Sequence, residues 1–242
     1  MRGLLTALSF LTRLVPGRLC RSEELAAAMP WLPAVGLILG GLLVTPLALG
    51  LLASSPWVQA WLLLAGSLWL TRGLHLDGLA DVADAWGSGA RDERFWEIVK
   101  DSRMGAFGAM GLFMTLLGQL VLAQEMLVRQ AFGALAFAFM AGRLAAVFLA
   151  YSSKALARPG LGQLFIAGAT TRGLIVSATA SLAAGLALVR PLPLAAMLAA
   201  ALLPALALRS LARDRKGLNG DFLGAAIIMG EAAACLGWLV AA

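Results

Sequence analysis

The stretch AFGALAFAFMAGRLAAVFLAY, which runs from Ala131 to Tyr151, decides the class of fold. A single charge, on Arg143, interrupts it, and roughly 20 apolar residues in a helix cross the ~30 Å hydrocarbon core of a bilayer. The whole chain of 242 residues is similar, with 61% hydrophobic and 13% charged residues. Soluble domains have about 45–50% apolar and about 25% charged residues. The composition therefore excludes a water-soluble globule and indicates an all-α protein that crosses a membrane several times.

Seven segments are apolar enough to form membrane helices, although one of them, Trp57–Thr71, is short. The stretch Gly3–Arg13 is too short to span, and no small-residue cleavage site follows it, so we expect an interfacial or re-entrant helix rather than a signal peptide. No repeat or linker divides the chain, so we expect one membrane-embedded domain over residues 1–242. The expected spans are Trp31–Ala53, Trp57–Thr71, Phe107–Val128, Ala131–Tyr151, Gly173–Val189, Leu192–Leu208 and Phe222–Ala241.

Glycine spacing predicts how these helices meet. Gly36 and Gly40 form a GxxxG pair, and Gly105, Gly108 and Gly111 recur at helical spacing. Small residues at such intervals let two membrane helices approach closely. We therefore expect tight helix contacts at both places.

The distribution of basic residues predicts the orientation. With a cytoplasmic N-terminus, 16 of the 19 Lys and Arg residues fall in cytoplasmic segments, 2 on the opposite side and 1 within a helix. Cytoplasmic loops of membrane proteins carry such an excess of positive charge. This excess accounts for the net charge of +6, so the charge does not indicate a nucleic-acid partner. The expected surroundings of the chain are a lipid bilayer.

The expected cytoplasmic segment 72–106 carries three aspartates, Asp77, Asp81 and Asp84, at positions i, i+4 and i+7. On a helix they fall within an arc of roughly 60°, where like charges repel and apolar neighbours make bare anions costly. A divalent cation relieves both problems, and Mg²⁺ prefers carboxylate oxygens and also holds substrate phosphates. We therefore predict a Mg²⁺ site here, with a solvated acidic helix face as the plain alternative.

Further polar residues follow and precede this motif. His75, the single histidine, lies about 160° around a helix from the aspartates, so a polar contact suits it as well as a role as general base. Asp101 and Ser102 have the residue types of a helix cap. Alternatively, Asp101 adds a carboxylate to the metal site while Arg103 and helix-end N–H groups meet phosphate.

The last expected helix adds two acidic residues. Asp221, at its start, is either a helix cap or a further metal ligand. Glu231 lies ten residues later, about 15 Å deeper and near the middle of the bilayer, where acids are costly and commonly functional. Arg143 lies at a similar depth, so we expect a structural Arg143–Glu231 ion pair. From the residues alone we expect a membrane enzyme, because cytoplasmic carboxylates, a divalent metal and nearby basic groups suit phosphoryl transfer.

The run HLDGLADVAD, from His75 to Asp84, resembles the HLDGLAD-x-x-D motif of the cobalamin synthase family, also called adenosylcobinamide-GDP ribazoletransferases. A departure follows the motif, where Ala85 and Trp86 precede the glycine that many relatives have there. Further matching blocks occur in order over almost the whole chain: Leu8–Leu14, Asp101–Gly105, Gly142–Arg143, Arg158–Gly162, Gly220–Ala226 and Gly230–Glu231.

The resemblance implies the last assembly step of the cobalamin nucleotide loop in a bacterial inner membrane, with the active site facing the cytoplasm. Adenosylcobinamide-GDP and α-ribazole, or its 5′-phosphate, would give adenosylcobalamin, or its 5′-phosphate, and GMP, with Mg²⁺ required. Partnership with a second copy or with other late enzymes of the pathway stays open. The implied metal ligands are Asp77, Asp81 and Asp84 with Asp101 or Asp221, the implied catalytic residues are Asp77, Asp81 and His75, and the implied substrate contacts are Lys100, Ser102, Arg103 and Arg158.

Two other functions remain as alternatives. A CDP-alcohol phosphotransferase also combines hydroxyl attack with a nucleotide leaving group, but Asp81 stands where its motif expects arginine, and the later Gly-x-x-x-Asp-x-x-x-Asp is missing. A membrane transporter could use Arg143 and Glu231 near the middle of the bilayer. Against transport, the other acids cluster at one face of the membrane and the sequence shows no inverted repeat.

Overall fold

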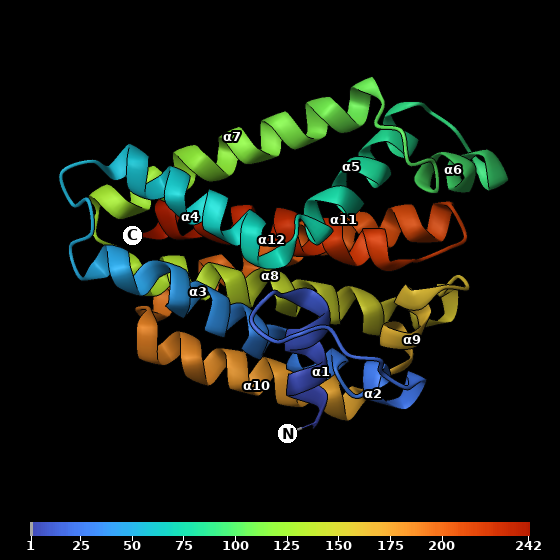
Figure 1. Cartoon of the computed structure of the whole chain (residues 1–242), viewed down its shortest axis with the longest axis horizontal. Helices are drawn as coiled ribbons and strands as arrows, with labels where there is room; N and C mark the ends of the chain where they lie inside the picture. The colour runs from blue at the N-terminus through green and yellow to red at the C-terminus, as the bar shows by residue number, and fades with distance from the viewer. Residues whose placement is uncertain (1) are drawn as a thin grey trace.

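The computed structural model describes residues 2–242, so Met1, which belongs to the expected single domain, lies outside the described residues. The described chain is helical and contains no strand, only an isolated bridge between Ala157 and Leu218, which confirms the expected all-α class. The long helices run side by side along the longest axis of the molecule, and the short helices gather toward one end (Figure 1). The α-helices are α1 (Arg2–Leu11), α2 (Ser22–Ala26), α3 (Leu32–Ala48), α4 (Pro56–Thr71), α5 (Leu74–Gly87), α6 (Asp92–Val99), α7 (Ala106–Val128), α8 (Phe132–Ser152), α9 (Leu161–Ala167), α10 (Thr171–Leu188), α11 (Pro191–Asp214) and α12 (Gly220–Ala241).

Six segments of the described chain are long and apolar enough to cross a membrane, so the expected number of about seven is close. The difference lies at α4, whose 16 residues extend only about 24 Å at ~1.5 Å per residue. The helix ends there because Arg72 and Gly73 have positive φ angles of 58° and 67° and turn the chain into α5. The six segments are Ser22–Ala48, Ala106–Val128, Phe132–Ser152, Thr171–Leu188, Pro191–Asp214 and Gly220–Ala241.

The helices α8 and α12 form the centre of the bundle. They are the most buried of the long helices because their apolar side chains pack against each other and against α3, α5 and α11. Close contact between α3 and α8 depends on glycine. A Cβ atom added at Gly36 would overlap the carbonyl oxygen of Phe139, and one added at Gly40 would overlap that of Ala136. The predicted GxxxG contact is therefore confirmed.

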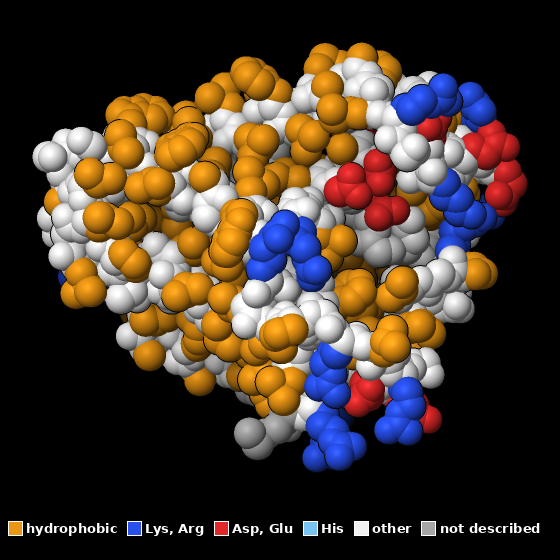
Figure 2. Space-filling model, in the orientation of Figure 1, with side chains coloured by type: hydrophobic (Ala, Val, Ile, Leu, Met, Phe, Trp, Pro, Cys, Tyr) orange, Lys and Arg blue, Asp and Glu red, His pale blue; other side chains and the backbone are white. Residues whose placement is uncertain are grey.

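Large apolar side chains cover the outer surface of the long helices, as Figure 2 shows for one face. They include Phe113 and Met114 on α7, Ile175 on α10 and Leu203 on α11, all of them exposed. Charged side chains gather instead toward the end that carries α5 and α6 and near α1 and α2 (Figures 1 and 2). An apolar belt of this kind is what a multi-pass membrane protein presents to lipid.

Candidate active site

The site begins where α5 crosses the start of α12. A Cβ atom added at Gly78 would lie 2.7 Å from the Cα atom of Asp221, so the two backbones touch at this glycine. Gly78 lies between Asp77 and Asp81 on α5, and the crossing therefore brings both of these residues close to Asp221. Burial raises the pKa of Asp81 to about 7, with further contributions from the negative charges of Asp221, Asp77 and Asp84. We call Asp77, Asp81 and Asp221 the carboxylate cluster.

Asn219 orients the third member of this cluster. Its side-chain oxygen accepts a hydrogen bond from the backbone N–H of Phe222, at 3.4 Å, so Asn219 rather than Asp221 caps α12. Its side-chain amide donates to Oδ2 of Asp221. Asn219 was not among the predicted site residues, although an Asn directly before an apolar helix is a typical cap. The side chain of Asn219 therefore binds Oδ2 of Asp221 and makes no hydrogen bond to Oδ1.

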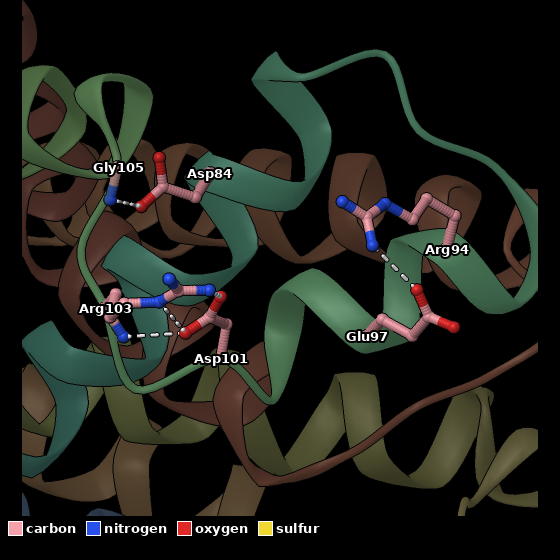
Figure 3. Close-up of polar contacts among 6 residues, drawn as sticks. All are labelled: Asp84, Arg94, Glu97, Asp101, Arg103 and Gly105. Atoms are coloured by element: carbon pink, nitrogen blue, oxygen red, sulfur yellow. Dashed lines mark hydrogen bonds and ion pairs between the residues drawn. The ribbon is translucent and has the colours of Figure 1, made fainter.

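Asp84 makes hydrogen bonds that the sequence did not predict. Its Oδ2 atom accepts a hydrogen bond from the N–H of Gly105 and its Oδ1 atom accepts one from that of Gly108, both at 2.7 Å (Figure 3 draws the first). The carboxylate thus holds the positive end of α7, where negative charge is stabilising. The predicted close packing at Gly105 and Gly108 is confirmed, with Asp84 filling the space beside both glycines.

The segment between α6 and α7 holds an ion pair that the sequence did not predict. The guanidinium of Arg103 donates to both oxygens of Asp101, from Nε at 3.0 Å and from Nη2 at 2.7 Å (Figure 3). These hydrogen bonds lower the pKa of Asp101 to about 2. Both side chains lie at the surface, and Lys100 is exposed at the end of α6. Asp101 is therefore paired with Arg103 and does not join the carboxylate cluster.

Within residues 2–242 no three His, Cys, Asp or Glu side chains come close enough to surround a metal ion. Metal ligation by Asp77, Asp81, Asp84, Asp101 and Asp221 thus stays a prediction, and the geometry favours the carboxylate cluster over the other two aspartates.

His75 is buried in α5, close to the inner part of the bundle. Burial, followed by the positive charge of Arg143, lowers the pKa of His75 to about 3, so its imidazole is neutral at pH 7. Among the described residues its Nε2 atom has no hydrogen-bond partner. So weak a base suits a polar contact better than proton abstraction.

Two adjoining cavities meet at the carboxylate cluster. The wide cavity measures about 1000 Å³ and the narrow cavity about 400 Å³. Phe10, Leu74 and Leu161 line both, so the two spaces share walls. The polar residues of the wide cavity include Arg18, Arg72, Asp77, Asp81 and Ser102, and those of the narrow cavity are His75, Arg158, Asn219 and Asp221.

Arg72 fixes the wall of the wide cavity, a role that the sequence analysis missed. Its Nη2 atom donates to the backbone oxygens of Ser9, Phe10 and Thr12, at 3.3, 2.9 and 3.3 Å. These are carbonyls at the C-terminal end of α1, which a cation stabilises. The position of Arg72 directly after α4 and before the aspartate motif was the available signal.

Deeper in the bundle, the Nη1 atom of Arg143 donates to Oε1 of Glu231 at 2.7 Å and to the carbonyl oxygen of Phe139 at 2.9 Å. Both charged side chains are buried. The ion pair predicted from their equal depth is therefore confirmed.

Fold and site together define a multi-pass helical membrane protein with a carboxylate cluster between two cavities at one end of its bundle. Comparison with known proteins agrees, because the family model for cobalamin-5-phosphate synthase matches residues 3–239. The chain belongs to this family and is a transferase of cobalamin biosynthesis, as the motifs predicted.

Curated relatives support the same family over the full length. A protein of Nitratidesulfovibrio vulgaris strain Miyazaki F, named adenosylcobinamide-GDP ribazoletransferase, is 49% identical over 99% of this chain and 96% of its own length. One of Brevibacillus brevis with the same name is 36% identical over 98% of this chain and 97% of its own. No solved structure matches the chain.

The contacts of Asp84 lead to a prediction. Replacing Asp84 by Asn should remove one of the two hydrogen bonds to α7 and lower the free energy of unfolding by about 1–3 kcal/mol. Thermal unfolding of the detergent-solubilised protein measures this loss. The exposed Asp214→Asn on α11 is the control and should change stability by less than about 0.5 kcal/mol. Unchanged stability together with complete loss of activity would instead make Asp84 a metal ligand.

Proposed function

We propose that this chain transfers the cobinamide phosphoryl group of adenosylcobinamide-GDP to α-ribazole, or to α-ribazole 5′-phosphate, and releases GMP. The product is adenosylcobalamin or its 5′-phosphate. The observation that carries the proposal is the carboxylate cluster, placed where two cavities of different size adjoin. Membership of the family and the names of the relatives support it.

Mg²⁺ is part of the proposal, and the residues present fit it. Asp77 and Asp221 offer hard oxygen donors from two helices, and Mg²⁺ is usually held by one or two carboxylates together with substrate phosphates. Burial and, to a smaller extent, the negative charges of the neighbouring aspartates raise the pKa of Asp81, and a cation relieves the repulsion between these charges. When bound, Mg²⁺ would neutralise charge that develops on the diphosphate.

The remaining chemistry falls to the side chains. A ribose hydroxyl of the acceptor attacks the phosphorus attached to the cobinamide arm, a new P–O bond forms, and the P–O bond to GMP breaks. Asp81 accepts the hydroxyl proton on its carboxylate, because it lines the wide cavity within the carboxylate cluster and burial raises its pKa above the usual value of an aspartate. GMP leaves as an anion. The two cavities would hold the two reactants, with Asp81 in the wall of the wide cavity and Asp221 in the wall of the narrow one.

We further propose that the carboxylate cluster faces the cytoplasm from a bacterial inner membrane. Of the 19 basic residues, 16 fall on the cytoplasmic side in that orientation. Soluble nucleotide substrates are present on the same side.

Activity measurements on the purified protein in liposomes test the proposal. With adenosylcobinamide-GDP and α-ribazole 5′-phosphate, we expect equal amounts of GMP and of a new corrinoid, formed only when Mg²⁺ is present. Chelation with EDTA should stop the reaction, and added Mg²⁺ should restore it. GMP without a corrinoid product would indicate a hydrolase, and the absence of GMP from folded protein would refute the proposed transfer.

A further inference from the structure

We propose that the narrow cavity binds the acceptor nucleotide and that Arg158 binds its 5′-phosphate, so that the wide cavity is left for the cobinamide nucleotide. This inference rests on the proposed function and assigns each of the two substrates to a place.

Size separates the two cavities. Ligand pockets commonly measure about 300–1,000 Å³, and the narrow cavity of about 400 Å³ is large enough for a nucleoside phosphate with a flat azole base. A corrinoid is several times larger and cannot enter it. The wide cavity, at about 1000 Å³, accepts the larger nucleotide-bearing arm of the donor. The apolar side chains of Leu32, Phe165 and Leu223 in the narrow cavity suit an aromatic base.

Arg158 is the one Lys or Arg that lines the narrow cavity in the described chain. Its guanidinium lies over the ring of Trp96, 4.5 Å from the ring centre, and its backbone N–H donates to the carbonyl oxygen of Leu218. Because the guanidinium stacks by its face, its N–H donors point outward at the edge, where a phosphate can bind in a bidentate manner in place of Glu93. These two neutral contacts hold Arg158 in place independently of its anionic partner.

The present anionic partner of Arg158 is weakly held. Its Nη2 atom lies 3.2 Å from Oε2 of Glu93, and the Glu93 side chain is 79% exposed. Ion pairs in such surroundings contribute little to stability. A phosphate carries more charge and three acceptor oxygens, so it competes effectively with Glu93 for the same donors.

A second polar group of the narrow cavity lacks a protein partner. His75 is 3% exposed and lines the cavity, and its Nε2 atom has no hydrogen-bond partner within residues 2–242. Buried polar atoms are nearly always hydrogen-bonded, so this nitrogen is an unsatisfied group behind the wall of the cavity. Because it is closed off from the cavity, the assignment of the acceptor rests on Arg158 and on the size of the cavity.

The carboxylates are divided between the cavities in a way that suits this assignment. Asp221 lines the narrow cavity, while Asp77 and Asp81 line the wide one. An acceptor hydroxyl in the narrow cavity and a donor diphosphate in the wide cavity therefore meet at the carboxylate cluster.

The two acceptors differ by one phosphate, which gives a direct test. The quantity to measure is the ratio of kcat/KM for α-ribazole 5′-phosphate to kcat/KM for α-ribazole, in liposomes. Arg158→Gln should lower this ratio tenfold to a hundredfold, as expected for the loss of a charged hydrogen-bonding partner, and Arg158→Lys should restore part of it. Arg213→Gln, at an exposed site that lines neither cavity, is the matched control and should leave the ratio unchanged.

A second variant covers the case in which Arg158→Gln does not fold. Glu93→Gln removes the competing carboxylate from an exposed position and should raise the ratio about twofold to fivefold. An unchanged ratio in Arg158→Gln or in Glu93→Gln would overturn the assignment, as would a selective rise in KM for adenosylcobinamide-GDP. If the wild-type protein makes no corrinoid product from either acceptor, the proposed function itself fails, which is a distinct outcome.

Discussion

Replacing Asp81 by Asn should lower kcat by about a hundredfold to ten-thousandfold, because the variant cannot accept the proton of the attacking hydroxyl. Asn has nearly the same shape, so the crossing of α5 and α12 at Gly78 and the packing of both cavities should stay intact. The measurement is the rate of corrinoid product formation with saturating Mg²⁺ and both substrates. Asp214→Asn, at an exposed position outside both cavities, should react at the wild-type rate.

The same variant should be more stable than the wild type when Mg²⁺ is absent. Since folding raises the pKa of Asp81 to about 7, the folded protein binds this proton more tightly than the unfolded chain, whose aspartates have a pKa of about 4. The stability of the wild type should therefore fall as pH rises from about 4 to 7, and this part of the fall should be missing in Asp81→Asn. Because Asp81 is only half-buried, solvent screening reduces the gain to about 1 kcal/mol, or about 2–4 °C in Tm at pH 7.5.

A loss of activity together with a gain in stability distinguishes a catalytic carboxylate in an unfavourable environment from a structural one. If Asp81→Asn lost both activity and thermal stability, Asp81 would instead be holding α5 in place. If it kept more than a tenth of the wild-type kcat, another group would be the base.

The sequence was sufficient for the features that depend on local pattern. Apolar stretches of about 20 residues predicted the all-α membrane fold, and the i, i+4, i+7 spacing placed Asp77 and Asp81 on one helix face. The equal depth of Arg143 and Glu231 predicted their contact, since opposite charges buried in a bundle are stable only when they are paired. Each of these inferences needed only helical geometry and the properties of the bilayer.

The features that the sequence could not supply depend on which helices cross and where. Asp84 shares a face with Asp77 and Asp81, but the start of α7 lies beside it and takes up both of its oxygens. Asp101 is one of the acids near the motif, yet Arg103, two residues later, pairs with it. The short α4, in contrast, was predicted, because the expected span Trp57–Thr71 ends at the same residue as the helix, directly before the left-handed residues Arg72 and Gly73.

Replacing Glu231 by Ala should lower the free energy of unfolding by about 3–5 kcal/mol. The change leaves the guanidinium of Arg143 buried without its carboxylate partner, and uncompensated buried charge is among the most destabilising defects in a protein. The hydrogen bond from Arg143 to the carbonyl of Phe139 remains, but a neutral acceptor does not balance the charge. Equilibrium unfolding in mild detergent, followed by tryptophan fluorescence, measures the loss.

The double variant Arg143→Met with Glu231→Met separates the pair from its packing. Removing both charges replaces a buried ion pair by apolar side chains of similar length, which is often neutral or stabilising, so the double variant should be at least as stable as the wild type. A double variant as unstable as Glu231→Ala would show that the two residues act independently. Neither residue lines the wide or the narrow cavity, so the stable double variant should also keep its activity. A double variant that folds but makes no corrinoid product would show that the ion pair also serves the reaction.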